Sequence, residues 1–423
     1  MTQGDPYEAK RGRGFLARLG PGLVTGAADD DPSGIGTYSQ IGAQFGYQLA
    51  WTMLFSYPLL VAIQAICARI GAVTGKGVAA NLREFYPRPV LLAGVMLLIV
   101  ANVINLGADI GAMAETLGLL LPGPLLLYTF LFGLLSVLLE VFVSYDRYAG
   151  ILKWVTASLL SYVGVVFVAQ APLGYALRGI VMPAFTLDKA HAMGLVAVLG
   201  TTISPYLFFW EASEEVEELH RRKARPLREE PARARAELVR IGTDNLAGMA
   251  YSQAIAIIII VATAATLHAH GVTQITSAAQ AAQALKPIAG SFAFALFAVG
   301  IIGIGLLAVP VLAGSTAYAV SETFGWNEGL DRRPRDARPF YAVIALATLG
   351  GFLLNLFDID PMVALYWAAA VNGVLAAPLM VLTMLLARDR RVMGELAIGP
   401  LLVIGGWGAT VVMAAASAIF LLS

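Results

Sequence analysis

The chain has little charge and almost no cysteine. Charged residues make up 13% of its 423 residues, whereas hydrophobic residues make up 58%. Because a soluble globular domain carries about 25% charged residues, this balance excludes that class and is typical of a polytopic membrane protein. Cys67 is the only cysteine, which excludes both a disulfide framework and a metal cluster held by cysteines.

The sequence also lacks the marks of an enzyme and of a cleaved leader. It contains no Gly-rich phosphate loop, no nucleophile paired with a base and no zinc-type spacing. The N-terminal segment is basic, but no small-residue cleavage site closes a short apolar run. We therefore expect no enzymatic activity, no cofactor and no signal peptide.

Long apolar runs dominate the sequence. Taking about 20 apolar residues as one membrane span, we predict an all-α polytopic membrane protein that forms a single transmembrane domain over 1–423, with a tail at 1–14. The predicted helices lie near 15–45, 49–72, 90–119, 124–145, 149–172, 193–218, 242–267, 289–320, 339–357, 361–386 and 398–421.

The distribution of positive charge predicts the orientation of these helices. With a cytoplasmic N-terminus, 24 of the 28 Lys and Arg residues lie on the inner side, whereas only Arg178, Lys189 and Lys286 lie outside. This asymmetry predicts a multi-pass protein of the cell (inner or plasma) membrane with its C-terminus outside. The basic stretch 220–240 is then a cytoplasmic linker facing the lipid bilayer, so no nucleic-acid partner is needed to explain it. No obligate protein partner is evident either.

The first apolar segment contains three consecutive acids, Asp29, Asp30 and Asp31, followed by Pro32 and Gly34. Each Asp at mid-membrane depth costs about 2.5–3.5 kcal/mol, so the three cannot face lipid. Pro32 removes a backbone donor and Gly34 loosens the backbone, so we predict that the helix breaks here. Carbonyls freed beside a carboxylate provide hard-oxygen ligands for a cation.

A second break is predicted at residues 200–213, where Pro205 interrupts a polar stretch. The two breaks lie five predicted spans apart, which makes 15–172 and 193–386 an inverted repeat, with 398–421 as an eleventh helix. Broken helices at matching positions of two repeats indicate a midplane substrate site in a secondary transporter. The alternative is two ordinary proline kinks, which the acids and hydroxyl groups around the breaks disfavour.

Three motifs carry a resemblance to a known family. They are GPGLVTG with DPSG in the first helix, QAICARIGAVTGKGVA in the second and GTTISPYLFFWEAS in the sixth. With these motifs the sequence resembles the Nramp superfamily of divalent-metal transporters. The resemblance covers nearly the whole chain and implies the LeuT-type fold, a 5+5 inverted repeat with helices 1 and 6 broken.

The resemblance also implies a set of metal ligands. In the family the breaks are Asp-Pro-Gly-Asn and Ala-Thr-Val-Met-Pro-His, and the Asp, the Asn, the Met sulfur and the Ala carbonyl hold the metal. Asp31 matches the metal-binding Asp, and Gly34 falls at the Asn. Thr201 falls at the Ala, Ser204 at the Met and Tyr206 at the His.

Every departure from the family pattern favours a hard ion. Loss of the thioether removes the ligand that selects transition metals, and loss of the Asn makes room for a partly hydrated ion such as Mg²⁺. The chain is similar in this respect to the Nramp-related magnesium transporters, although related plant proteins without the Met carry aluminium. We expect Mg²⁺ as the transported ion, with Mn²⁺ also carried.

Proton coupling, a second property of the family, lacks its residues here. The segment that matches the family's acidic stretch on helix 3 is 105–108, which contains no acid, and Tyr206 and Glu211 replace histidines on helix 6. We therefore expect alternating access without proton coupling. A proton-coupled Mn²⁺/Fe²⁺ importer remains the alternative, and three aspartates at the site disfavour an organic-substrate symporter.

Several other intramembrane polar residues stand out. Asp30 and Asp109 are candidate acids just outside the ligand set, Asp109 because it shares a helical face with Asn105. The sequence assigns no role to Asp29, Glu140 or Glu211. Glu140 and Arg69 are intramembrane charges. By default we expect each either to form a structural ion pair or to extend its charged end to the membrane surface. The pair 372–373 in the tenth helix predicts a hinge or close packing.

Overall fold

The computed structural model describes residues 25–26, 28–143, 157–184, 186, 188–330, 332–357 and 359–422. Within these ranges every regular element is a helix. The predicted tail at 1–14, the beginning of the first helix and the beginning of the helix predicted at 149–172 lie outside the described residues.

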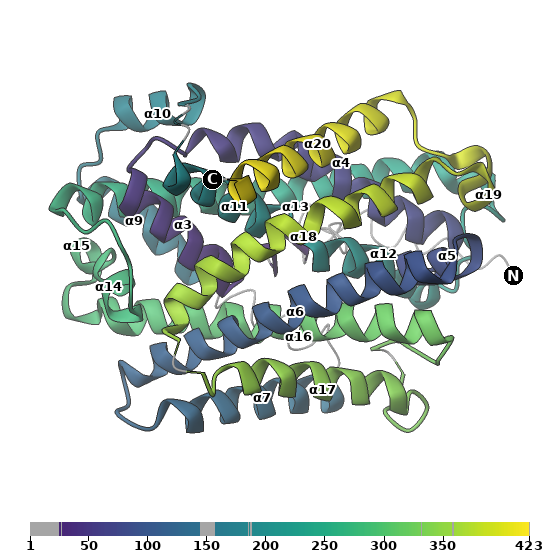
Figure 1. The fold of residues 1–423 in the computed structure, drawn as a ribbon, viewed down its shortest axis with the longest axis horizontal. Coiled ribbons are helices and arrows are strands. Elements are labelled where there is room, and N and C mark those ends of the chain that lie inside the picture. The colour runs from purple at the N-terminus through teal and green to yellow at the C-terminus, as the bar shows by residue number, and fades with distance from the viewer. Residues whose placement is uncertain are drawn as a thin grey trace, which may run out of the picture.

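Long helices form an elongated bundle (Figure 1). They are α4 (Trp51–Thr74), α6 (Arg88–Gly118), α7 (Leu125–Phe142), α13 (Pro231–Thr266), α16 (Ala293–Phe324), α17 (Arg338–Leu354), α18 (Pro361–Arg388) and α20 (Pro400–Leu422). Eight helical stretches of the described chain have the length and apolarity to cross a membrane. These stretches correspond to eight of the eleven predicted spans, each a long apolar run that only a helix can carry through lipid. The helix predicted at 242–267 begins earlier, at Pro231, and the described helices near 149–172 and 339–357 are shorter apolar ones.

Short helices close the two ends of the bundle. Figure 1 shows α5 (Val78–Phe85) and α19 (Arg390–Met393) at one end, called here the α5 end. The opposite end, called the α14 end, carries α9 (Ser161–Val168), α10 (Leu173–Val181), α14 (Ala278–Gln283) and α15 (Lys286–Ala289). Single 3₁₀ turns complete the chain: η2 (Ala157–Leu160), η3 (His268–His270), η4 (Gly290–Phe292) and η5 (Gly394–Leu396).

Both predicted helix breaks are confirmed. The helix α3 (Pro32–Phe45) begins at a proline whose preceding residue, Asp31, has extended backbone. The helix α11 (Lys189–Thr202) ends before Ser204, which is also extended, and α12 (Pro205–Arg221) begins at the next proline. Proline suits the first helical position because the N–H that it lacks has no partner there. From the middle of the bundle, α3 extends towards the α14 end and α12 towards the α5 end (Figure 1).

Close backbone contacts fix the broken helices against their neighbours. A Cβ atom on Gly200 of α11 would lie 2.1 Å from the carbonyl oxygen of Ala369 on α18. The helix α18 runs without interruption through Asn372 and Gly373, and Gly373 lies against Gly200. Of the two predicted roles, the contact with Gly200 supports close packing, and the helix is not interrupted at this position.

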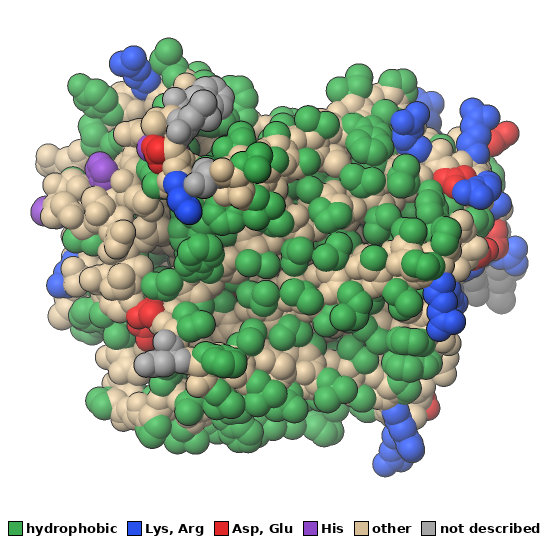
Figure 2. Space-filling model, in the orientation of Figure 1, with side chains coloured by type: hydrophobic (Ala, Val, Ile, Leu, Met, Phe, Trp, Pro, Cys, Tyr) green, Lys and Arg blue, Asp and Glu red, His purple; other side chains and the backbone are tan. Residues whose placement is uncertain are grey.

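The surface matches a chain that lies in lipid. In Figure 2 hydrophobic side chains cover the middle of the visible face, whereas Lys and Arg side chains gather mainly at the α5 end. On α7 large apolar side chains point outwards, including Phe130 at 50% exposure and Phe142 at 77%. An apolar band between polar ends is what a hydrocarbon layer requires of a membrane protein.

Candidate metal centre

Asp31 lies at the first break as the N-cap of α3. Its Oδ1 atom accepts hydrogen bonds from the Gly34 N–H and the Ser33 hydroxyl, both at 2.7 Å. The side chain is 1% exposed. Because the N-terminus of a helix carries partial positive charge, it favours the ionised carboxylate at this position.

The two breaks meet at the Asp31 carboxylate. The Tyr206 hydroxyl of α12 lies 3.2 Å from Asp31 Oδ2 and 3.0 Å from the carbonyl oxygen of Ala28, so one proton serves two acceptors. The hydroxyl oxygens of Ser33 and Thr201 lie 3.4 Å apart. Residues far apart in the sequence thus bring their oxygen atoms together in the middle of the bundle. We call this group the break site; it consists of Ala28 (carbonyl), Asp31, Ser33, Thr201, Ser204 and Tyr206.

Ser204 and Gly34 lie where the sequence places the two missing family ligands. The Ser204 hydroxyl donates to the carbonyl oxygens of Gly200 at 3.0 Å and Thr201 at 2.8 Å, which leaves its oxygen lone pairs free to accept or coordinate. A Cβ atom on Gly34 would lie 3.5 Å from Asp31 Oδ1, an ordinary contact distance. The position therefore borders the carboxylate and has room for a side-chain stem.

Asp29 and Asp30 lie beside the break site and contact α13. The Ser252 hydroxyl on α13 lies 2.6 Å from Asp29 Oδ2 and 3.2 Å from Asp30 Oδ1. The other oxygen of each carboxyl group has no hydrogen-bond partner among the described residues. Since both side chains are fully buried, these acids form a polar pair beside the break site. Ser252 carries no sequence signal that would have identified it in advance.

Asp109 on α6 faces the break site from the other side. Its carboxyl group is fully buried, lies within electrostatic range of Asp31 and faces the backbone N–H of Ser33. Neither of its oxygens makes a hydrogen bond within the described chain. The structure therefore brings Asp109 close to the predicted ligand Asp31, whereas Asp30 points to α13.

The break site offers only oxygen ligands. It combines one carboxylate with hydroxyl and carbonyl oxygens, and the described part of the chain contains no cluster of three His, Cys, Asp or Glu side chains. Such a set suits a hard divalent cation that keeps part of its water, because few protein ligands replace the hydration shell. Ser33 and the Ala28 carbonyl were not in the predicted set; only their closeness to Asp31 in sequence pointed to them.

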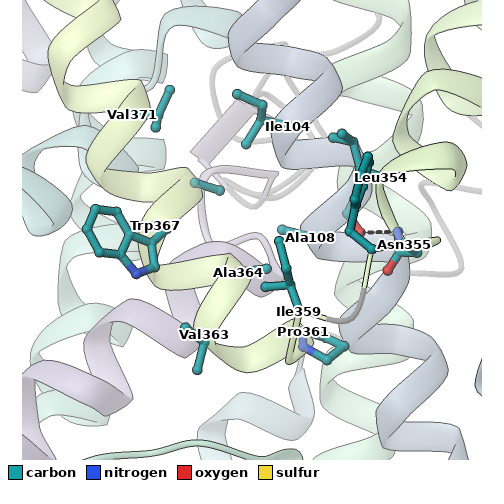
Figure 3. Close-up of a pocket in the computed structure, with 13 residues that line it drawn as sticks. Ile104, Ala108, Leu354, Asn355, Ile359, Pro361, Val363, Ala364, Trp367 and Val371 are labelled. Atoms are coloured by element: carbon teal, nitrogen blue, oxygen red, sulfur yellow. Dashed lines mark hydrogen bonds between the residues drawn. The ribbon is translucent and has the colours of Figure 1, made fainter.

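A separate cavity lies away from the break site. It measures about 430 Å³ and is bounded by α6, α18 and the link between α17 and α18 (Figure 3). Ile104 and Ala108 line it, whereas Asn105 and Asp109 lie on the other face of α6. No residue of the break site contributes to its wall, and Trp367 on its rim is 53% exposed. An apolar hollow with exposed aromatic walls is unsuited to a metal ion.

Two further intramembrane charges have separate surroundings. Glu140 on α7 is 4% exposed, and its Oε1 atom lacks a hydrogen-bond partner in the described chain. Arg69 on α4 donates to the carbonyl oxygens of Leu396 at 2.9 Å and Ala397 at 3.3 Å. Arg69 thus fastens the link before α20 to α4 through backbone carbonyls, and the ion pair expected as one default is replaced by these bonds.

Comparison with known proteins gives a consistent result. The profile of the family described as natural resistance-associated macrophage protein-like (Nramp) matches residues 22–423. A divalent metal cation transporter MntH of Klebsiella pneumoniae is 30% identical over 394 residues, covering 90% of this chain and 88% of that protein. A protein of the same name from Verminephrobacter eiseniae is 27% identical over 387 residues, covering 87% and 84%.

Solved structures share the fold at lower identity. A mutant of the Eremococcus coleocola manganese transporter matches with a TM-score of 0.78 and 14% identity, covering 99% of this chain and 88% of that one. MhsT in complex with L-phenylalanine matches with a TM-score of 0.63 and 13% identity, covering 95% and 99%. Mhp1, a nucleobase-cation-symport-1 family transporter, matches with a TM-score of 0.58 and 16% identity, covering 95% and 92%. The all-α, LeuT-type architecture expected from the sequence is confirmed.

Proposed function

Because this chain belongs to the Nramp family, whose profile covers residues 22–423, we propose that it transports divalent metal cations across a membrane by alternating access. It is a multi-pass membrane protein and not an enzyme. The observation that carries the proposal is the break site, where Asp31 meets the Tyr206 hydroxyl of α12 and the neighbouring Ser33 meets the Thr201 hydroxyl of α11.

We propose Asp31, Thr201 and Ser204 as ligands, with Gly34 leaving space for water, and Asp109 as an acid outside this set. In the described state the Tyr206 proton lies between the Ala28 carbonyl and the Asp31 carboxylate. A cation bound by Asp31 occupies the carboxylate oxygen to which Tyr206 donates, so the Tyr206 hydroxyl proton then turns fully to the Ala28 carbonyl. The charge of the ion then balances the buried carboxylate.

Mg²⁺ is the ion that this ligand set favours, and Mn²⁺ is carried as well. Sulfur ligands favour transition metals, whereas hydroxyl and carbonyl oxygens discriminate little between Mg²⁺ and Mn²⁺. Ser204 supplies a hydroxyl where the family has a thioether, and the single carboxylate, Asp31, suits an ion that keeps several waters.

Transport without proton coupling is the second part of the proposal. The segment 105–108 on α6 carries no acid and Tyr206 stands where the family has a His, so the residues of the family's proton pathway are missing. The membrane potential alone drives uptake, since two charges gain about 4.6 kcal/mol per 100 mV.

The proposed orientation places the α5 end in the cytoplasm, the N-terminus inside and the C-terminus outside the cell membrane. The gathering of Lys and Arg side chains at the α5 end supports it (Figure 2). The divalent ion and the lipid bilayer are the only partners that the proposal requires.

The second candidate is a proton-coupled Mn²⁺/Fe²⁺ importer. It is favoured by Asp109, a buried acid of α6 within electrostatic range of Asp31, and by the matched manganese transporter. An acid this close to the ion site is a potential proton carrier, because the bound cation displaces its proton.

Uptake into proteoliposomes under a potassium diffusion potential tests the proposal. Mg²⁺ and Mn²⁺ should enter at rates within about tenfold of each other, because oxygen ligands separate them weakly. Ca²⁺ serves as the larger competitor, and vesicles containing the Asp31→Asn protein are the control. Uptake of Mn²⁺ with Mg²⁺ excluded would favour the second candidate.

A further inference from the structure

One face of α13 carries a row of groups that contact the first helix and α12. Asn245, Gly248 and Ser252 are spaced by three and four residues, so they lie on one side of the helix. Ser252 at one end of the row binds Asp29 and Asp30. The row runs from these acids towards the α5 end of the bundle.

Gly26, a described residue just before the first break, lies tightly against this row. A Cβ atom on Gly26 would lie 2.3 Å from the carbonyl oxygen of Gly248, so the two backbones are in contact. One residue earlier, the Thr25 hydroxyl donates to Glu211 Oε2 of α12 at 2.5 Å. The first helix therefore covers the space between α12 and α13.

Under this cover Glu211 is a buried acid that no described cation balances. Its side chain is 0% exposed and its Oε1 atom has no hydrogen-bond partner in the described chain. The neighbouring Glu215 is different, because it pairs with Arg240 at 2.7 Å. Within the described chain, Glu211 is therefore an acid that a cation reaching this position can bind without first breaking an ion pair.

Asn245 completes the arrangement around Glu211. It is 1% exposed and its amide lies within hydrogen-bonding reach of the Glu211 carboxyl group, although neither amide atom meets the full geometry of a hydrogen bond among described residues. A buried amide held this loosely by one acid has polar capacity to spare. Rotation of the amide presents its oxygen to a cation held by Glu211.

Glu211 lies where an ion moving from the break site towards the α5 end would pass. Glu211 lies seven residues after Ser204 on α12, which is about 10 Å along the helix axis towards the α5 end. An ion that leaves the break site along this face meets no other unpaired acid of α12 before Glu211.

We propose that Glu211, Asn245 and Thr25 form a second, transient binding station for the transported divalent cation between the break site and the α5 end. The station rests on the proposed transport function. When Thr25 moves away from Glu211, the bond between them opens, the hydroxyl keeps its proton and the ion binds the freed Glu211 oxygen. A carboxylate, an amide oxygen and water are ligands that Mg²⁺ accepts.

A purely structural role for Glu211 makes a different prediction. If Glu211 only accepts the Thr25 hydrogen bond, Gln serves equally well, because its amide oxygen also accepts. If Glu211 binds the ion, loss of the charge is what matters. Glu211→Gln therefore separates the two roles with almost no change in side-chain shape.

The experiment measures initial Mg²⁺ uptake by the full-length protein in proteoliposomes over a range of Mg²⁺ concentrations. We expect Glu211→Gln to lower the maximal rate about tenfold with the KM changed less than about twofold, since the break site is intact. Glu211→Asp should recover most of the rate. Glu140→Gln, another buried intramembrane carboxyl group, should transport like the wild type.

If the Glu211→Gln protein transports Mg²⁺ like the wild type, or if its KM rises as much as its maximal rate falls, the proposed binding station is wrong. Absence of Mg²⁺ uptake by the wild type would overturn the transport function itself, so the two failures are distinguishable. Asn245→Leu provides a second test if the Gln protein does not fold, and it should also lower the maximal rate. Cys67, the only cysteine, is fully buried on α4. Its failure to react with a thiol label checks that each variant keeps the packing around it.

Discussion

Among single residues, Asp31 has two functions that substitution can separate. It caps α3 through the Gly34 N–H and it presents a carboxylate to the second break. Asn is as good an N-cap as Asp, whereas Ala is not. The sequence alone predicts that Asp31→Ala leaves folding intact, but the capping bond in the structure implies a cost.

Asp31→Asn should therefore lower Mg²⁺ uptake by about two orders of magnitude with little change in thermal stability, because only the charged ligand is lost. Asp31→Ala should lose uptake and also about 1 kcal/mol of stability with the cap. Uptake assays and thermal unfolding in detergent measure both effects. A stable Asp31→Asn protein that transports Mg²⁺ like the wild type would exclude Asp31 as a ligand.

Selectivity depends on two other single residues, Ser204 and Gly34. Ser204→Met should shift preference towards Mn²⁺ only weakly, because Gly34 leaves space for intervening water. The double variant Ser204→Met with Gly34→Asn should shift it by more than the sum of the single effects, since both side chains then contact one ion. A Cβ atom added at Gly34 has room beside Asp31, so the Asn side chain can be accommodated. Additive changes in the Mn²⁺/Mg²⁺ uptake ratio would show that the two positions do not share an ion.

For the helices, the breaks were predictable and the side-chain directions were not. Pro32 and Pro205 act on their own helices, so the local sequence suffices to place the interruptions. The turn of Asp30 towards Ser252 and of Asp109 towards Asp31 depends on which helices pack together, and no local pattern encodes that. The short helices α5 and α14 escaped prediction because they lie at the ends of the bundle, where no long apolar run marks them.

Packing between α11 and α18 provides a test at the level of helices. Gly200→Ala should destabilise the protein by about 1–3 kcal/mol, because its Cβ meets the Ala369 carbonyl and must displace a helix. The matched control is Gly242→Ala on α13, whose Cβ would meet nothing within 4 Å. The control should leave stability unchanged or raise it by up to about 1 kcal/mol. Equal melting temperatures for the two variants would contradict the close contact.

For the whole molecule, the apolar runs of the sequence suffice to predict an all-helical membrane protein, and eight described helical stretches are long and apolar enough to cross a membrane. The meeting of the two breaks follows from the repeat of five spans. The arrangement at the α5 end, with Glu211 beneath the first helix, required the structure, because Thr25, Glu211 and Asn245 are distant in sequence.

Orientation can be tested by labelling, since the native Cys67 is buried. Lys286→Cys at the α14 end should react with a membrane-impermeant maleimide on intact cells. Lys76→Cys at the α5 end should react only after permeabilisation, because the basic end is held in the cytoplasm. The reverse pattern would place the α5 end outside.

The most direct test of uncoupled magnesium transport is a simultaneous record of internal Mg²⁺ and internal pH in the same proteoliposomes under an inside-negative potential. The account predicts that Mg²⁺ enters while internal pH stays constant, and that an imposed pH gradient without a potential drives no uptake. Acidification of the lumen in step with Mg²⁺ entry, or uptake driven by the pH gradient alone, would contradict it.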